Sequence, residues 1–409
     1  MRLGRLDMGQ RSETVRRANL SAIVRGLHER GPLSRSELVH LTGLTRSAIR
    51  ALVGELVAAG VVIQEPAVRM GTPGRPSPIA RANPRRPVVL GIEIMVDSIA
   101  AVIMGLGGVI IAQARIERPR GDLSSDHVVA DITGLAADLI RGLDAPPVGI
   151  GVAVAGIVRR SDGLVWAAPN LGWVEVPLGD LLASSLGLDV PISIANDADM
   201  GLLAEHRRGV AVGIDDVLYV SGEVGVGGGA IIGGHPLTGV AGYGGEIGHM
   251  PLNPGGIPCR CGSSGCWETE VGESALLTLA GLPPDAGWAG VETVLRDAAA
   301  GAPTALAALD HVGRWLGIGL AGLVNVLNPQ LVVLGAMHAQ IYPAVRSAME
   351  AELDRRALRA PRNSVRVAPA AIGVGAPAIG AAELAFEPLL DDPAAYFGAA
   401  DIQLQLASA

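Results

Sequence analysis

Lysine is absent from this sequence of 409 residues, and all 32 of its basic residues are arginine. A chain without lysine has no lysine nucleophile, forms no Schiff base through a lysine amine, and cannot build the lysine-containing loop of P-loop proteins. Aromatic residues are also scarce, at 3% of the chain. The cores must therefore consist of Val, Ile, Leu and Ala, and the length predicts two or three domains.

The sequence also lacks a long hydrophobic run. The longest apolar stretches, such as residues 99–112, extend for 14 residues and contain glycine, whereas a helix that spans a bilayer needs about 20 residues. Residues 1–17 contain no apolar signal core. We therefore expect no membrane span and a cytoplasmic protein, and the hydrophobic content of 49% argues against disorder.

Charge is distributed unevenly along the chain. Residues 1–86 carry 15 Arg against 6 Asp and Glu, a net charge of +9. The other 323 residues carry 17 Arg against 34 Asp and Glu, a net charge of −17, and the two parts sum to −8. A basic N-terminal segment on an acidic body indicates that only this segment meets nucleic acid. A solvated basic arm is the alternative.

The N-terminal segment has the pattern of a helix-turn-helix. Apolar residues at helical spacing predict a first helix over residues 19–30. Ser34 can cap a second helix, with Glu37 completing a capping box. After a turn at residues 42–44, Thr45 can cap a third helix. Two helices joined by a short turn that contains glycine form a helix-turn-helix.

The third helix and the segment after it carry the expected DNA contacts. The first turns of a recognition helix enter the major groove, where arginine reads guanine edges. Residues 61–81 predict two short strands around a tip, which would be the wing of a winged helix. A protein-docking module is the alternative to double-stranded DNA. The predicted DNA-binding residues are Arg46, Ser47, Arg50, Arg69 and Arg75.

The body shows an α/β pattern that occurs twice. Short apolar runs at residues 88–94, 98–104 and 109–116 predict strands, and residues 127–143 predict a helix. A similar strand hairpin rich in glycine begins at residue 217. Two such openings indicate a duplicated α/β unit with a cleft between two lobes.

All three cysteines fall within eight residues, at Cys259, Cys261 and Cys266, and His249 lies ten residues before the first. Three thiolates and one imidazole complete a tetrahedral Zn²⁺ site with no open position, which indicates a structural metal. A disulfide with one free thiol is the alternative, and it fits a cytoplasmic protein poorly.

Polar residues of several loops could converge near this metal loop. Glu246 and Glu268 flank the metal ligands, Asn170 lies in a loop, and Asn196 and Asp197 link a strand-like run to a helix. An Asn-Asp pair is by itself most often a helix cap. Near the metal loop it fits polyol recognition, because a sugar needs several carboxylates and amides around one pocket.

These motifs resemble the ROK family (repressors, open reading frames, sugar kinases), in its transcriptional-regulator branch with an N-terminal winged helix. The motifs are E-x-x-H before C-x-C-G-x-x-G-C-x-E over residues 246–268, the loop at 169–173, the Asn-Asp pair, the glycine-rich run at 225–229, and the segments at 327–336 and 375–385. The resemblance implies an α/β fold, namely a winged helix-turn-helix plus a two-lobed actin-like body, assembled as a homodimer or homotetramer.

The resemblance also implies roles for residues and boundaries for domains. Hexose contacts are expected from Asn170, Asn196, Asp197, Glu246, His249 and Glu268, and Asp197 matches the general base of kinase members. His249 would serve both the metal and the sugar. The expected divisions are a winged helix-turn-helix at 1–82, a linker at 83–87, an N-terminal lobe at 88–195, a C-terminal lobe with the zinc loop at 196–375, and a segment at 376–409 that returns to the N-terminal lobe.

The phosphate loops depart from the kinase pattern. The first loop, D-x-G-G-T in kinases, reads Glu-Ile-Met-Val-Asp at residues 93–97, and the second, G-T-G-x-G-G-G, reads Glu-Val-Gly-Val-Gly-Gly-Gly at residues 223–229. Each loop loses the residues that meet phosphate and gains an acid, which repels a polyphosphate. We therefore predict no kinase activity, with Asp197 a vestigial base.

The sequence thus predicts a sugar-responsive transcriptional regulator, most simply a repressor of carbohydrate genes. It would bind an inverted-repeat operator and a small sugar effector, without phosphorylating the sugar. An ATP-dependent sugar kinase with a DNA-binding head is one alternative, and a regulator controlled by a protein partner is the other.

Overall fold

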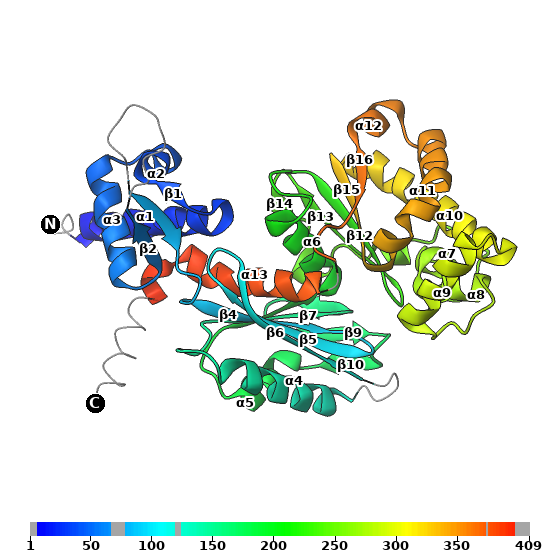
Figure 1. The fold of residues 1–409 in the computed structure, drawn as a ribbon, viewed down its shortest axis with the longest axis horizontal. Coiled ribbons are helices and arrows are strands. Elements are labelled where there is room, and N and C mark those ends of the chain that lie inside the picture. Colours follow the sequence, from blue (N-terminus) through cyan, green and yellow to red (C-terminus); the bar gives the residue numbers. More distant parts are fainter. Residues whose placement is uncertain (1–5, 67–77, 119–123, 374, 397–409) are drawn as a thin grey trace.

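A computed structural model describes residues 6–66, 78–118, 124–373 and 375–396 (Figure 1). It has an N-terminal head and a body of two lobes, each lobe built on a mixed five-stranded sheet. The fold is therefore the predicted α/β arrangement of a winged helix-turn-helix on a two-lobed body. None of the described helices combines the length and the apolar character needed to cross a membrane.

The head is a three-helix unit with a small antiparallel sheet in the order β1-β3-β2. Its elements are α1 (Leu6–Arg30), β1 (Leu33–Ser34), α2 (Arg35–Thr42), α3 (Arg46–Ala58), β2 (Val62–Glu65) and β3 (Ile79–Ala82). The capping box is present, because the Ser34 hydroxyl accepts from the Glu37 N–H at 3.3 Å and the Glu37 carboxylate accepts from the Ser34 N–H at 2.7 Å. Thr45 caps α3 by accepting from the Ala48 N–H. The capping residues predicted from the sequence therefore mark the first residues of α2 and α3.

Helix α1 begins at Leu6, well before the predicted start at residue 19. Residues 13–18 of this extension are exposed or half-buried, and two ion pairs connect them to the rest of the chain. Arg16 pairs with Glu55 of α3 at 2.6 Å, and Arg17 pairs with Asp392 at 3.2 Å. A prediction based on apolar periodicity misses such a segment because its contacts are polar.

The N-terminal lobe contains the sheet β11-β7-β4-β5-β6 and a smaller sheet β10-β9-β8. Helices α4 and α5 cover one face of the larger sheet (Figure 1). The elements are β4 (Val88–Ile94), β5 (Ser98–Gly105), β6 (Val109–Glu117), α4 (Ser125–Ile140), β7 (Ile150–Val154), β8 (Ile157–Arg159), β9 (Leu164–Ala168), β10 (Trp173–Val176), α5 (Leu178–Leu186) and β11 (Ile192–Asn196).

The C-terminal lobe repeats this topology. Its sheet runs β16-β15-β12-β13-β14, with the same succession of two parallel and two antiparallel pairings as in the first lobe. The predicted duplication is therefore confirmed. The elements are β12 (Val217–Gly222), β13 (Val226–Ile232), β14 (His235–Pro236), α7 (Glu268–Val271), α8 (Glu273–Leu279), α9 (Gly287–Ala299), α10 (Pro303–Leu327), β15 (Leu331–Gly335), α11 (Ala336–Arg356), α12 (Arg359–Ser364) and β16 (Arg366–Pro369).

Two helices cross between the lobes. Helix α6 (Asp197–Arg208) follows the last strand of the first lobe and packs on β12 and β13 of the second. Helix α13 (Ala376–Asp391) follows the last strand of the second lobe and packs on β4 and β7 of the first. The two helices also pack against each other. A Cβ atom at Gly380 would lie 1.8 Å from the Met200 carbonyl oxygen, so the crossing requires glycine there.

We predict that Gly380→Ala lowers the free energy of unfolding by about 1–3 kcal/mol or more, because the added methyl group meets backbone that cannot rotate away. Gly322→Ala is the matched control, since Gly322 is exposed on α10 and a Cβ there meets nothing within 4 Å. The control should gain about 0.5–1 kcal/mol from better helix propensity. Urea denaturation measures both, and equal midpoints for the two variants would contradict this account of the crossing.

Candidate functional site

The six side chains predicted to contact a sugar line one cavity of about 370 Å³ between the lobes. They come from separate segments: the loop between β9 and β10, the β11–α6 junction, and the loop that joins β14 to α7. These six residues are Asn170, Asn196, Asp197, Glu246, His249 and Glu268. The fold therefore gathers amide, carboxylate and imidazole groups from both lobes around one space.

Asn196 is a helix cap as well as a lining residue. Its side-chain oxygen accepts from the N–H groups of Ala198 at 2.8 Å and Asp199 at 3.3 Å, and its amide donates to the Gly156 carbonyl at 3.1 Å. These bonds fix the start of α6 relative to the strand before it. The side-chain NH2 group of Asn196 thus uses one of its two hydrogens in these bonds.

Asp197 is the first residue of α6 and faces the cavity. Burial raises the pKa of its carboxyl group to about 6, although backbone N–H groups of the helix start act in the opposite direction. Asp199, two positions further into the first turn, forms an ion pair with Arg160 at 2.7 Å. At neutral pH the Asp197 carboxylate is an acceptor for a ligand hydroxyl.

The predicted metal ligands form one cluster. The ligand atoms of His249, Cys259, Cys261 and Cys266 all lie within 4.8 Å of one another. The sulfur atoms of Cys261 and Cys266 are 3.6 Å apart, and Cys259 Sγ lies 3.7 Å from His249 Nδ1. A tetrahedral metal site with metal–sulfur bonds of about 2.3 Å has edges of about 3.8 Å. The donor set and its spacing therefore fit a metal ion.

Further bonds join the metal loop to the cavity wall. Glu268 Oε1 accepts from the Cys259 thiol at 2.7 Å. Arg260, which lies between two of the cysteines, donates to the Asn170 side-chain oxygen at 3.0 Å and lines the cavity. Arg260 was not among the site residues predicted from the sequence, although its position inside the C-x-C segment could have indicated it.

A second cavity of about 690 Å³ adjoins the first, and both share Ser221, Glu223 and Val224 among their lining residues. Glu93, Asp97 and Glu223 line this second cavity. They belong to residues 93–97 and 223–229, the two segments that the family resemblance matches to phosphate loops. Acids of both segments thus face the same space.

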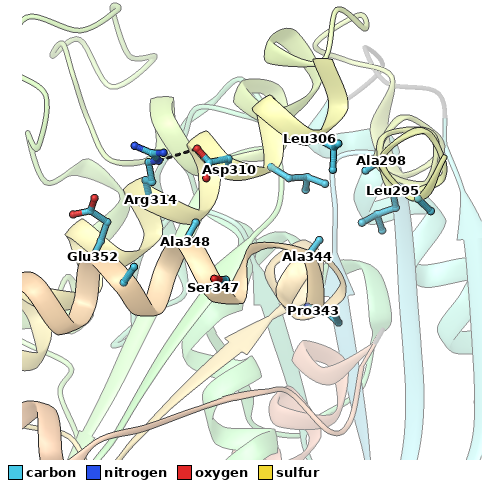
Figure 2. A pocket seen from close by; sticks show the side chains of 13 residues that line it. Leu295, Ala298, Leu306, Asp310, Arg314, Pro343, Ala344, Ser347, Ala348 and Glu352 are labelled. Atoms are coloured by element: carbon cyan, nitrogen blue, oxygen red, sulfur yellow. Dashed lines mark hydrogen bonds and ion pairs between the residues drawn. The ribbon is translucent and has the colours of Figure 1, made fainter. Parts of the chain in front are cut away.

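A third pocket lies away from the cleft, between helices α9, α10 and α11 (Figure 2). Figure 2 shows mostly small apolar side chains such as Leu295 and Ala348, with one ion pair between Arg314 and Asp310. Glu352, which also lines this pocket, is paired with Arg355 and Arg356. This groove therefore lacks the convergent polar groups of a sugar site.

Three of the predicted DNA-binding residues lie on the exposed face of α3. Arg46 and Ser47 are in its first turn and Arg50 is one turn later, and all three are exposed. The other two, Arg69 and Arg75, lie outside the described residues. The strands β2 and β3 that flank them are present and antiparallel.

The C-terminal end of α6 contacts the head. Arg208 donates to Glu383 of α13 at 2.7 Å and to the His28 carbonyl of α1 at 2.9 Å. His28 is fully buried, and its Nδ1 accepts from the Gly107 N–H at 3.0 Å. Nε2 therefore carries the hydrogen and donates to Glu383 at 2.8 Å. Helix α6 thus starts at the cavity and ends at the DNA-binding head.

This network was also missed from the sequence, because its members lie up to 355 residues apart. Burial alone would raise the pKa of Glu383, but the hydrogen bond from His28 and the guanidinium of Arg208 outweigh burial and lower it. Arg207 adds contacts to Glu29 of α1 and, at 3.0 Å, to Glu387 of α13. A histidine within an otherwise apolar helix face was the available signal.

Comparison with known proteins gives the family. A sequence model of the ROK family matches residues 89–387. The chain is 29% identical to the xylose repressor of Bacillus subtilis (strain 168) over 382 residues, which cover 92% of this chain and 97% of the repressor.

Solved structures agree with this relationship. The crystal structure of a ROK family transcriptional regulator, a homolog of the E. coli MLC protein, matches with a TM-score of 0.76 at 24% identity, over 92% of this chain and 97% of that one. A ROK family glucokinase from Streptomyces griseus, in complex with glucose and AMPPNP, matches with a TM-score of 0.65 at 28% identity, over 73% and 99% of the two chains. Since the family match extends over most of the body, this chain belongs to the ROK family.

Proposed function

We propose that this protein is a sugar-responsive DNA-binding transcriptional repressor that binds its sugar without phosphorylating it. One observation carries the proposal: α6 begins among the polar groups of the cleft and ends in the network that holds the head. Similarity to a protein named xylose repressor supports the regulatory role. Because it acts on DNA, we place it in the cytoplasm.

The cavity has the groups that a small neutral sugar needs. The Asp197, Glu246 and Glu268 carboxylates would accept from hydroxyl groups, and Asn170 can both donate and accept. His249 Nδ1 belongs to the cysteine cluster, so Nε2–H is free to donate to the ligand. A related glucokinase binds glucose, and a related repressor is named for xylose, so pentoses and hexoses are the ligands to test.

We further propose that the cluster holds Zn²⁺, which three sulfur ligands and one nitrogen ligand favour. A bound Zn²⁺ would supply a structural crosslink of the loop and would polarise the His249 ring. Metal binding requires the thiolate form of Cys259. Glu268 Oε1 then has no thiol donor and can accept from a sugar hydroxyl.

The adjoining cavity argues against kinase activity. A nucleotide there would bring its phosphates against Glu93, Asp97 and Glu223 in a site with no lysine to neutralise them. Asp197 would thus serve only as an acceptor. Sugar control in this proposal needs binding alone, since a ligand shifts an equilibrium by its differential affinity for two states.

The proposed assembly is a homodimer or homotetramer on an inverted-repeat operator, with half-sites about one helical turn or a multiple apart. Its units would be the winged helix-turn-helix at 1–82, the linker at 83–87, the lobes at 88–195 and 196–375, and the returning segment at 376–409. Arg46, Ser47 and Arg50 would read the major groove, and Arg69 and Arg75 would contact DNA from the wing. Closure of the lobes on sugar would tilt α6 and change the spacing of the two heads.

The first prediction of the proposed function concerns sugar binding. Calorimetric titration of the Zn²⁺-loaded protein with pentoses, hexoses and N-acetylated sugars should detect binding without nucleotide and no ADP in the presence of ATP and Mg²⁺. Asp197→Asn should weaken binding at least tenfold, because a hydrogen bond to a charged group contributes about 1.5–3 kcal/mol. Asp138→Asn, at an exposed pair on α4, should bind as the wild type does. ADP formation would establish a kinase. If none of the sugars binds, control by a protein partner is favoured.

A second prediction concerns the metal. The purified protein should contain one Zn²⁺ per chain by elemental analysis, and Cys266→Ser should lose the ion and unfold at a lower temperature. Ser264→Ala changes an exposed residue of the same loop and should keep the ion. Loss of sugar affinity together with Zn²⁺ would show that the loop positions Glu268. A wild-type protein that contains no metal would refute the assignment.

The third prediction tests the link through α6. On a duplex selected from a random pool, Arg50→Ala should weaken DNA binding at least tenfold. The double variant Arg208→Gln with Glu383→Gln removes both charges together, which avoids one unpaired buried charge. It should bind sugar within twofold of the wild type, while the sugar-induced change in DNA affinity falls at least fivefold. An unchanged response would mean that coupling does not pass through this network.

A further inference from the structure

The second cavity of the cleft has a charge pattern that neither a neutral sugar nor a nucleotide explains. Five of its lining residues are acids, and the single basic residue among them, Arg115, already bonds Glu117 at 2.7 Å. Two of the five, Glu93 and Glu273, are buried, and Asp97 and Glu223 are half-buried. Acids gathered in a low-dielectric space repel one another, so the cavity is poised for a positive charge.

Glu93 gives independent evidence for a missing partner. Its side chain is 2% exposed, and Oε2 has no hydrogen-bond partner. A backbone N–H at Ala378, in the first turn of α13, bonds the carboxyl group, so one acceptor is satisfied and the other is not. Buried carboxylate oxygens rarely stay without a donor. The unsatisfied atom belongs to a residue that lines the cavity.

The pKa values of Glu93 and Glu223 also indicate that this cavity favours a positive charge. Burial, followed by the charge of Asp197, raises the pKa of Glu93 to about 7, against a smaller opposite effect of Arg115. Burial and then the charges of Asp197, Glu93, Asp97 and Glu273 raise the pKa of Glu223 well above its ordinary value. At neutral pH these carboxyl groups therefore retain protons, and a bound cation would favour their ionised form.

The geometry points to an organic cation rather than a metal ion. Among the residues that the structure describes, only the His249 cluster brings three or more ligand atoms close enough to hold one ion. The cavity also offers apolar surface, from Met95, Trp288 and Met337. Such a space accommodates a carbon body with a charged end.

We propose that the cavity between Glu93 and Glu223 binds the primary ammonium group of an amine ligand. The ammonium would donate to the free Glu93 oxygen and to Glu223, which also lines the sugar cavity. The amine is therefore either part of the sugar effector, as in an amino sugar, or a separate amine bound beside the sugar. This site goes beyond the proposed function, which needs only the first cavity.

Calorimetry on the Zn²⁺-loaded full chain separates these two sources. If the amine belongs to the effector, glucosamine should bind at least tenfold tighter than glucose. If it is separate, putrescine should bind at saturating sugar. In either arm, binding at pH 7 should release protons, because a cation favours the ionised carboxylates, and buffers of different ionisation enthalpy measure this release. Affinity should fall as the pH drops below about 7.

The isosteric variants Glu93→Gln and Glu223→Gln should each weaken amine binding at least tenfold, with Asp138→Asn as the unaffected control. A merely structural role predicts lower stability in these variants, whereas a repulsive ligand site predicts higher stability. A carboxyl group with a raised pKa loses stability as the pH rises from about 4.5 through 7, so the gain in melting temperature should be larger at pH 8 than at pH 5.

Two results would overturn the inference: neither amine binds, or amine binding is unchanged in both glutamine variants. The proposed function fails separately. Sugar binding with no amine binding removes only the ammonium site. Amine binding with no response to any sugar leaves the ammonium site in place and removes the sugar sensor.

Discussion

The crossing of α6 and α13 is the contact on which the rest of the molecule depends. Each helix leaves the sheet of one lobe and covers the sheet of the other, so the two lobes are tied together by exchanged helices. The contact is close because Gly380 faces the Met200 carbonyl, and because Gly91 and Gly151 let α13 lie directly on β4 and β7. Because backbone packs directly against backbone here, the two helices have little room to slide past each other. We therefore expect the lobes to move relative to one another as rigid bodies about the crossing of α6 and α13.

The site and the head are two ends of this arrangement. The N-terminus of α6 is fixed by the Asn196 cap in the cleft, and its C-terminus carries Arg207 and Arg208 into the head interface. A helix of 12 residues is about 18 Å long and stiff on that scale. In the proposed function, a small rotation of α6 at the cleft would therefore reach α1 with its direction preserved. The connection requires no chain of side-chain rearrangements between the two sites.

The parts of the fold that the sequence predicted are those encoded by neighbouring residues. Ser34 with Glu37, and the spacing of the cysteines, signal a cap and a metal loop because the interacting atoms are close along the chain. The two strand hairpins were equally visible, since their alternation is local. The early start of α1 was not visible, because Arg16 and Arg17 in this extension form ion pairs to α3 and to Asp392 rather than apolar contacts.

The candidate site was partly predictable for the same reason. Motif spacing and the family resemblance selected six residues, and the structure places all six around one cavity. Arg260 and the network of His28, Arg208 and Glu383 escaped prediction, since each depends on a partner that only the folded chain brings near. A sequence can signal which side chains suit a ligand more readily than it can signal which ones connect that ligand to another domain.

The docking of the head has a consequence for how a signal can reach DNA. The head is tethered to the body by residues 83–87, and Asn83 bonds back to Gly60 at 2.8 Å. The face of α1 thus meets α13 as an intramolecular ligand, at the high effective concentration that a short tether gives. Buried side chains of both partners, such as Leu27 of α1 and Phe386 of α13, belong to one hydrophobic cluster. We therefore expect the head to move together with α13 as a packed unit, so that a signal changes the direction of the head and not its attachment.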